Sequence, residues 1–205
     1  QILYRIAEML EGRRDQFAGY GIEESTVDAA IDRWVWYAGW ADKIAVVYGG
    51  ANPVAGPYFN ISAPEPTGVV GVVAPEDPLL GLVSVVAPAI VTGNTVVVLA
   101  SEANPLPAIS LAEVLATSDL PGGVVNLLTG QVAETAPWLA SHMDVNALDL
   151  SGVSEPALAA DLERAAAENL KRVLRPSPVD WTADPGTGRM TVLLETKTVW
   201  HPKGV

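Results

Sequence analysis

The feature that most constrains the fold of this chain is an alternation of strand-like and helix-like segments that begins at Val69. Short apolar runs rich in valine and leucine, typical of buried strands, cover 69–74, 95–99, 124–128 and 146–150. Segments with helical character lie between and after them, at 79–92, 106–117, 132–141 and 155–169. Strands separated by helices favour right-handed crossover connections and a parallel sheet that is buried on both faces. The sequence therefore predicts an α/β domain over residues 68–175.

The composition supports a folded core and disfavours several kinds of partner. Hydrophobic residues make up 49% of the 205 residues, which suits one large domain or one domain with an appendage. The net charge of −12 opposes binding to nucleic acid or to anionic lipid, because these polyanions would be repelled. No apolar run has the length of a membrane span, and no secretion signal opens the sequence. We therefore expect a cytoplasmic protein without a nucleic-acid or membrane partner.

Several kinds of chemistry have no candidate residues in this sequence. It contains no cysteine, which excludes disulfides, thiolate zinc sites and a cysteine nucleophile among these residues. Glu76 and Asp77 are adjacent carboxylates, but a metal site needs ligands that converge and no histidine lies near them in sequence. His142 and His201 are isolated from each other and from any relay of polar residues. We expect no metal site and no catalytic residue in this chain.

The segment before the alternating region predicts helices. Residues 2–17 have the 3.6-residue period of an amphipathic helix, and a capping box at 25–28 indicates the start of a second helix that runs toward Ile44. Residues 1–48 are therefore expected to be N-terminal helices that pack on the α/β domain.

Two strand-like segments lie at opposite ends of the α/β region. Residues 58–62 alternate like a strand, and the prolines that follow limit it to the edge of a sheet. A loop rich in proline and glycine at 175–188 acts as a linker to residues 191–200, which read as one long strand. Such a strand must pair, because an isolated one leaves a row of free backbone groups. We expect 57–71 and 189–205 to form a small antiparallel sheet.

A series of motifs resembles the aldehyde dehydrogenase superfamily and covers most of residues 1–155. In chain order they are Tyr37-Ala38-Gly39-Trp40-Ala41-Asp42-Lys43-Ile44, Glu65-Pro66-Thr67-Gly68-Val69-Val70-Gly71, Thr92-Gly93-Asn94-Thr95-Val96-Val97 and Leu120-Pro121-Gly122-Gly123-Val124-Val125-Asn126. The resemblance implies a Rossmann-like domain of the type that binds NAD. The whole chain most resembles the C-terminal, non-catalytic domain of the family-16 aldehyde dehydrogenases, through Asn169-Leu170-Lys171, Trp181 and the ending Thr196-Lys197-Thr198-Val199-Trp200.

The positions that carry chemistry in this family differ in this chain. The resemblance places a vestigial cofactor site at Pro75, Asp77, Glu102, Gly152 and Ser154. Asp77 stands where active relatives carry an oxyanion-stabilising asparagine, and a carboxylate there would repel a developing oxyanion.

Three further positions near this vestigial site also disfavour a cofactor. Leu99 stands where a ribose-binding lysine is usual, and Val153 replaces a hydroxyl. Glu155 would oppose an anion at the following helix start. Only about 50 residues follow Glu155, too few for the catalytic domain plus a terminal strand. We expect the catalytic domain to be absent and no cofactor to bind, although NAD is not excluded.

The parts that join subunits in the family look intact. The resemblance implies an oligomerisation sheet with interface residues Tyr58, Phe59, Thr196, Thr198 and Trp200. The favoured hypothesis is an inactive domain that scaffolds a homo-oligomer, or a hetero-oligomer with a catalytic aldehyde dehydrogenase. Two alternatives stay open: a residual sensor of NAD or another nucleotide, and a non-catalytic subunit of an active NAD-dependent enzyme whose cysteine lies on another chain.

Overall fold

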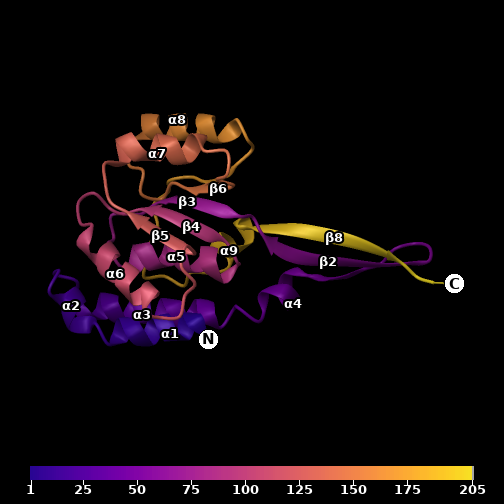
Figure 1. Cartoon of the computed structure of the whole chain (residues 1–205), viewed down its shortest axis with the longest axis horizontal. Coiled ribbons are helices and arrows are strands. Elements are labelled where there is room, and N and C mark those ends of the chain that lie inside the picture. The colour runs from indigo at the N-terminus through magenta and orange to yellow at the C-terminus, as the bar shows by residue number, and fades with distance from the viewer. Residues whose placement is uncertain (205) are drawn as a thin grey trace.

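A computed structural model describes residues 1–204, and Val205, the last residue of the predicted segment 189–205, lies outside the described part. The centre of the fold is a five-stranded parallel sheet with the strand order β5-β4-β3-β6-β7 (Figure 1). Its strands are β3 (Val69–Val73), β4 (Thr95–Leu99), β5 (Val125–Leu128), β6 (Ala147–Asp149) and β7 (Arg172–Leu174). The predicted α/β class and its parallel sheet are confirmed.

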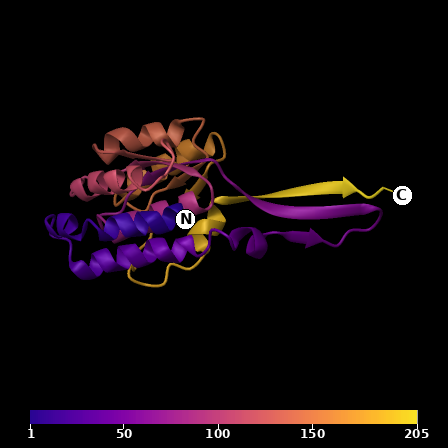
Figure 2. The same ribbon diagram turned by 60° about the horizontal axis from the view of Figure 1, so that its bottom comes forward.

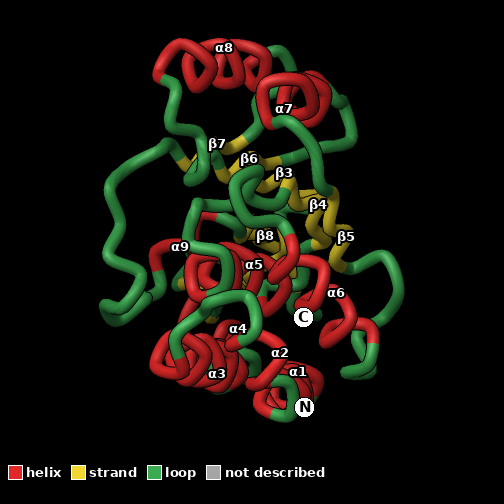
Figure 3. Tube along the Cα trace, turned by 90° about the vertical axis from the view of Figure 1, so that its left-hand side faces the viewer, coloured by secondary structure: helices red, strands yellow, loops and turns green. Residues whose placement is uncertain are grey.

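Helices cover both faces of this sheet, as the end-on view in Figure 3 shows. One face carries α7 (Val132–Ser141) and α8 (Pro156–Ala167). The other carries α5 (Leu80–Val91) and α6 (Leu106–Ala116), with the N-terminal helices as an outer layer. These four helices match the predicted segments to within two residues at every end. Among residues 1–204, no helix combines the length and apolar character needed to cross a lipid bilayer.

The N-terminal helices differ from the sequence prediction in their boundaries. They are α1 (Ile2–Glu11), α2 (Arg14–Ala18), α3 (Glu24–Ala38) and α4 (Ile44–Tyr48). The single helix expected over 2–17 is wrong, because α1 ends at Glu11 and α2 starts separately at Arg14. The predicted capping box is also wrong: the N-cap residue is Glu23, and no side chain caps α3. Ile6, Leu10 and Trp34 are fully buried in the core that these helices share with α5.

A three-stranded antiparallel sheet projects from this body as an arm (Figures 1 and 2). The arm consists of β1 (Gly50–Asn52), β2 (Tyr58–Pro66) and β8 (Leu194–Pro202), in the order β1-β2-β8. All nine residues of β2 pair with β8, in a register from Tyr58 opposite Pro202 to Pro66 opposite Leu194. Residues 69–71 of the predicted segment 57–71 belong instead to the parallel sheet.

Two strand predictions for the arm need correction. β2 is the middle strand and not an edge strand, because β1 pairs with its residues Asn60 to Ser62. Pro64 and Pro66 lie beyond this pairing, where no strand among residues 1–204 pairs with the side of β2 that faces away from β8. Thr191 and Val192, expected in the last strand, belong to the short helix α9 (Gly188–Val192). This helix anchors the base of the arm, since Met190 is fully buried.

The hydrogen bonds at the two ends of the β2–β8 ladder define which peptide groups of β8 are free. The N–H of Thr67 donates to Leu193 O at 3.2 Å, and the N–H of Lys203 donates to Pro57 O at 2.7 Å. Peptide groups alternate sides along a strand, so the odd-numbered residues of β8 face β2. Thr196, Thr198 and Trp200 therefore direct their backbone N–H and C=O groups to the open edge of the arm.

Candidate functional site

A crevice of about 510 Å³ lies at the carboxyl ends of the parallel strands. β3 has β4 on one side and β6 on the other, so the strand order changes direction between β3 and β6. In open α/β sheets, ligands bind at such a switch point. The crevice is lined by residues that follow three strands, at 74 and 76 after β3, 101–103 after β4 and 152–155 after β6, and by residues of α7 and α8.

The structure brings together three of the five predicted cofactor-site residues. Glu102, Gly152 and Ser154 all line the crevice. Pro75 and Asp77 do not belong to its lining and lie instead against α5, where both approach Gly81. Three of the five residues thus lie at one crevice and two lie outside its lining, and a role of any of them in holding a cofactor stays a prediction.

Asp77 has a structural contact that the sequence did not indicate. Its Oδ1 accepts hydrogen bonds from the N–H of Leu79 at 3.2 Å and of Gly81 at 2.9 Å, in the first turn of α5. A carboxylate at a helix N-terminus satisfies free N–H groups and interacts favourably with the helix dipole. The side chain thus stabilises the start of α5.

Glu102 is similarly engaged at the start of a helix. Its Oε1 accepts a hydrogen bond from the N–H of Val132, the first residue of α7. This contact links the loop after β4 to the helix after β5. The carboxylate stays exposed in the crevice, so its negative charge remains part of the site.

The crevice is acidic and has one unsatisfied hydroxyl. Glu76, Glu102 and Glu155 contribute three carboxylates, and no lysine or arginine belongs to the lining found among residues 1–204. Ser101 Oγ is buried without a hydrogen-bond partner. Val153 contributes an apolar surface, while Leu99 is 2% exposed and packs in the core beneath α7 and α8. An anionic group in this crevice would meet three like charges and no cation.

Gly152 is required by a close approach of two backbone segments. Its N–H donates to Val73 O at 2.9 Å, and a Cβ built on Gly152 would lie 1.9 Å from Ala74 O. Any side chain at this position would push the loop after β6 away from the end of β3. The glycine therefore sets the width of the crevice at the switch point.

A buried ion pair beside the crevice was missed by sequence reasoning. Asp149, the last residue of β6, pairs with Arg189 of α9, and their side chains are 3% and 19% exposed. Asp149 Oδ1 accepts from Ser151 N at 3.0 Å, and Arg189 Nη2 donates to Ser151 Oγ at 2.9 Å. The guanidinium also lies 5.1 Å from the ring centroid of Trp181. The only sequence feature that could have indicated this pair is Asp149 itself, a carboxylate at the end of an apolar strand.

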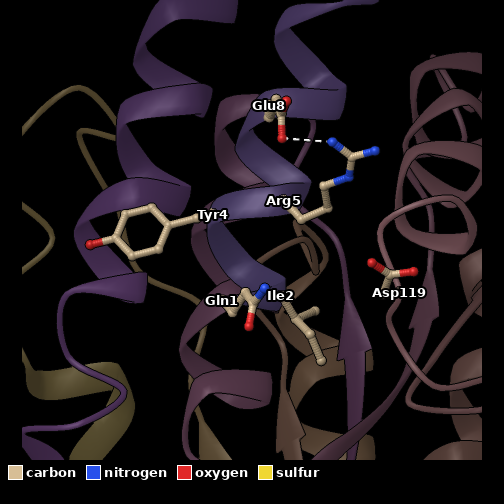
Figure 4. A pocket seen from close by; sticks show the side chains of 6 residues that line it. All are labelled: Gln1, Ile2, Tyr4, Arg5, Glu8 and Asp119. Carbon is tan, nitrogen blue, oxygen red and sulfur yellow. Dashed lines mark hydrogen bonds and ion pairs between the residues drawn. The ribbon is translucent and has the colours of Figure 1, made fainter.

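A larger hollow, of about 610 Å³, shares no lining residue with the crevice and is drawn in Figure 4. Its lining comprises Gln1, Ile2, Tyr4, Arg5, Glu8 and Asp119. Arg5 is already paired with Glu8 at 2.7 Å, and Figure 4 shows Tyr4 directed away from this pair. No group of three or more potential metal ligands gathers here or elsewhere in the described part of the chain. The hollow offers no convergent chemistry, so the crevice is the better candidate site.

The sheet order and the helices on both faces define a protein of the Rossmann-like α/β class. Residues 1–175 match the model of the aldehyde dehydrogenase family, and the chain belongs to that family.

Two curated relatives give the extent of this similarity. Cytosolic aldehyde dehydrogenase 1 of Elephantulus edwardii is 33% identical over 186 residues, which are 84% of this chain and 36% of that protein. Retinal dehydrogenase 2 of Homo sapiens is 36% identical over 148 residues, 72% of this chain and 28% of that protein. The chain thus spans about a third of the length of the curated relatives that it matches.

Solved structures of this family share the fold. The NAD+ complex of aldehyde dehydrogenase from Bacillus cereus superimposes with a TM-score of 0.77 at 27% identity, covering 84% of this chain and 36% of that one. Betaine aldehyde dehydrogenase from Staphylococcus aureus gives a TM-score of 0.76 at 25% identity, with the same coverage of both chains.

Proposed function

We propose that this chain acts through its arm, as a scaffolding or assembly part of an aldehyde dehydrogenase, and not through catalysis of its own. These 205 residues contain no cysteine, so a thiolate nucleophile would have to come from residues outside them. The acidic crevice supports the same proposal, because its three glutamates would repel an anionic cofactor or a developing oxyanion. The likeness to the non-catalytic domain of family-16 aldehyde dehydrogenases is part of this proposal.

The open edge of β8 is the observation that carries the proposal. Its nine residues form the outer strand of the arm, and eight of them are exposed. Three of them, Thr196, Thr198 and Trp200, direct unpaired backbone groups outward. A long exposed edge is a template for strand addition, and proteins normally cover or blunt such edges. Only Pro202, at the far end, lacks the N–H that a partner strand would use.

The side chains beside this edge offer anchors for a partner. Tyr58 and Trp200 pack edge-to-face with ring centroids 5.7 Å apart, and they are 41% and 55% exposed. Register places Thr196 and Thr198 on the same face of the arm as this pair, whereas Phe59 lies on the opposite face. Exposed aromatic residues dominate the binding energy of many interfaces. We infer that a partner strand adds to β8 and contacts this aromatic pair.

The partner is a second copy of this chain or a catalytic aldehyde dehydrogenase, and one substitution tests both. Thr196→Pro removes an outward N–H without breaking a β2–β8 hydrogen bond, and Thr196→Val is the matched control that keeps it. We expect light scattering to give an assembled mass for the wild type and for Thr196→Val, but a monomer for Thr196→Pro. Mixing with a catalytic partner tests the hetero-oligomer in the same way.

The control for this experiment is the far-ultraviolet circular dichroism spectrum, which should be the same in all three proteins because the β2–β8 pairing is kept. The unfolding midpoint of Thr196→Pro should be lower, since assembly stabilises the folded state by mass action. An unchanged mass and unchanged partner binding in Thr196→Pro would contradict the proposal. Deletion of residues 190–205 is a poorer test, because it also removes the buried Met190 and Leu193 from the core.

The cofactor proposal concerns the crevice. A pyrophosphate fits its lining badly, because three carboxylates surround it and no cationic side chain offsets them. We therefore propose that NAD does not bind, with a nucleotide sensor as the alternative that the unpartnered Ser101 hydroxyl favours. Titration of NAD+ by calorimetry separates the two: absence of heat at millimolar NAD+ removes the sensor, and saturable heat overturns the proposal.

The remaining alternative is a contributing subunit of an active NAD-dependent enzyme whose cysteine lies on another chain. The extended match to aldehyde dehydrogenases over residues 1–175 favours it. Activity of the purified pair, compared with the catalytic partner alone, tests it. An unchanged rate and unchanged thermal stability of the partner would exclude this alternative.

A further inference from the structure

The open edge of β8 is closed at its two ends by two different devices. At the base of the arm, Arg172 of β7 donates from Nη1 to Leu194 O, so this outward carbonyl already has a donor. At the tip, Pro202 has no backbone N–H to donate. Between these ends, the outward groups of the even-numbered residues 196–200 have no strand partner among residues 1–204. The edge thus has a satisfied acceptor at one end and a missing donor at the other.

These two ends complement each other when two copies of the edge are joined. A two-fold axis perpendicular to the strand makes the two copies of β8 antiparallel. With the axis at Thr198, this residue faces itself, and Thr196 faces Trp200 of the second copy. Leu194 then faces Pro202 of the second copy. Paired residues of this kind exchange N–H···O bonds, so the donor that Pro202 lacks is the one that Leu194 O does not need.

The two neighbouring symmetric registers fit less well. With the axis at Val199, Pro202 faces Thr196 of the second copy, whose outward carbonyl oxygen then has no donor. With the axis at Lys197, the two copies of this lysine lie directly opposite each other, and like charges in that position destabilise a sheet. Only the axis at Thr198, among these three registers, avoids both defects.

The side chains along the edge also suit the axis at Thr198. Thr196 lies beside Trp200 of the second copy, a pair of β-branched and aromatic side chains of the kind that stabilises sheets. On the opposite face of the arm, Glu195 lies across from His201 of the second copy, and Lys197 lies across from a valine. Like charges therefore do not meet in directly opposed positions.

We propose that the strand added to β8 is the β8 of a second copy of this chain, related by a two-fold axis at Thr198. The two three-stranded arms then form one continuous antiparallel sheet, with β8 of each copy at its centre. Figure 2 shows β8 as an outer strand of the arm, accessible along its length. The proposal rests on the proposed function of the arm and narrows it, because a catalytic partner would offer a different strand.

Single cysteines test this register directly, because the chain itself contains no cysteine. In a hydrogen-bonded antiparallel pair the Cα atoms lie about 5.5 Å apart, which a disulfide can span. Thr198→Cys should therefore give a covalent dimer with oxidised glutathione, seen on a non-reducing gel. Thr196→Cys and Trp200→Cys should each give none, because each lies about 14 Å along the strand from its own copy. An equimolar mixture of these two variants should give a covalent heterodimer.

Ala51→Cys is the matched control, since Ala51 is exposed on β1 at the other edge of the same sheet. It should give no covalent dimer, and cross-linking equal to that of Thr198→Cys would overturn the proposal. Cross-linking of Thr196→Cys alone, or none of Thr198→Cys while the wild type assembles, would also overturn it.

The outcomes separate this proposal from the proposed function. A wild type that is monomeric alone, but binds a catalytic aldehyde dehydrogenase and loses that binding in Thr196→Pro, would overturn the symmetric pairing and leave strand addition at β8 standing. A wild type that neither self-associates nor binds that enzyme would overturn both.

A second measurement does not depend on the geometry of a disulfide. A nitroxide label on Thr198→Cys should show strong dipolar broadening in its electron paramagnetic resonance spectrum, because the two labels flank the axis. The same label on Thr196→Cys should show weaker broadening, and dilution with unlabelled protein should remove the broadening in both. Equal broadening at the two positions, or none at Thr198→Cys in assembled protein, would refute the axis at Thr198.

Discussion

The side-chain amide of Asn94 donates to the carbonyl oxygen of Leu193 at 3.0 Å and thereby ties the first crossover of the parallel sheet to the base of the arm. The same amide donates to Ala89 O and Thr92 Oγ1, and its oxygen accepts from Gly68 N at 2.7 Å. Asn94 is 2% exposed, so water cannot replace these bonds. One side chain thus connects the end of α5, the start of β3 and the entry to β8.

Asn94→Ala should therefore destabilise the fold strongly. The loss should be about 3 kcal/mol in the free energy of unfolding, because several buried groups lose their partner at once. Urea unfolding followed by circular dichroism measures it. Asn126→Ala is the matched control, since Asn126 is exposed and its amide bonds two carbonyl oxygens; it should cost no more than about 1 kcal/mol. Equal losses in the two variants would contradict this reading of Asn94.

Gly152→Ala should also be severe, for a steric reason. The new Cβ would lie 1.9 Å from Ala74 O, and backbone cannot yield as a flexible side chain does. We expect a loss of about 3 kcal/mol or more in the free energy of unfolding. Gly122→Ala is the control, because a Cβ there meets nothing within 4 Å. A neutral Gly152→Ala in urea unfolding would show that the two strand ends are further apart than described.

The buried pair of Asp149 and Arg189 should behave as a coupled unit. Asp149→Asn leaves a largely buried guanidinium without its counter-charge and should cost about 3–5 kcal/mol. Arg189→Met should cost a similar amount, because it leaves the buried carboxylate of Asp149 without its counter-charge. The double variant should be much less destabilised than the sum of the two, as a double-mutant cycle in urea would reveal. Additive losses would mean that the two charges do not interact.

Tyr37 should make stability depend on alkaline pH. Desolvation raises its pKa from an ordinary value of 10.0 to about 12, against the opposing effect of Arg33 and Arg189, with Asp184 adding to the rise. The folded state therefore holds the proton more tightly than the unfolded state. The contribution of protonated Tyr37 to the free energy of unfolding is complete below pH 10 and is lost as the pH rises through 12.

The measurement for Tyr37 is a difference between variants, because other groups also titrate at high pH. From pH 10 upward, the wild type should lose up to about 1.4 kcal/mol per pH unit relative to Tyr37→Phe. Tyr4→Phe, at a position that is 51% exposed, should follow the wild type. Parallel curves for the wild type and Tyr37→Phe would mean that the hydroxyl is not desolvated.

The parallel sheet could be predicted because its signals are local and strong. Runs such as Val69–Val73 and Thr95–Leu99 are apolar, β-branched and bounded by turns. β7 escaped prediction because it has only three residues and begins with a charged arginine. α9 was read as strand because Thr191 and Val192 are β-branched, yet the burial of Met190 at the base of the arm favours a helical turn there.

The candidate site was less predictable because its contacts are formed between distant segments. Glu102, Gly152 and Ser154 were indicated by the family resemblance, and each follows a strand of the parallel sheet. The ion pair of Asp149 with Arg189 joins residues 40 positions apart, whereas the contact of Asp77 with Gly81 is local and depends on the orientation of the carboxylate.

The pairing of β2 with β8 has a consequence for the order of events during synthesis. β2 is made early, but its partner begins only at Leu194, after the whole parallel sheet has been translated. Contacts between such distant segments form late, because the entropy of closing a long loop is lost before the contacts contribute favourable free energy. The nascent chain therefore holds an unpaired β2 while its α/β body is already able to fold. The edge of β8 that we propose for assembly exists only once β8 has been made, so a chain interrupted before Leu194 presents the unpaired edge of β2 instead.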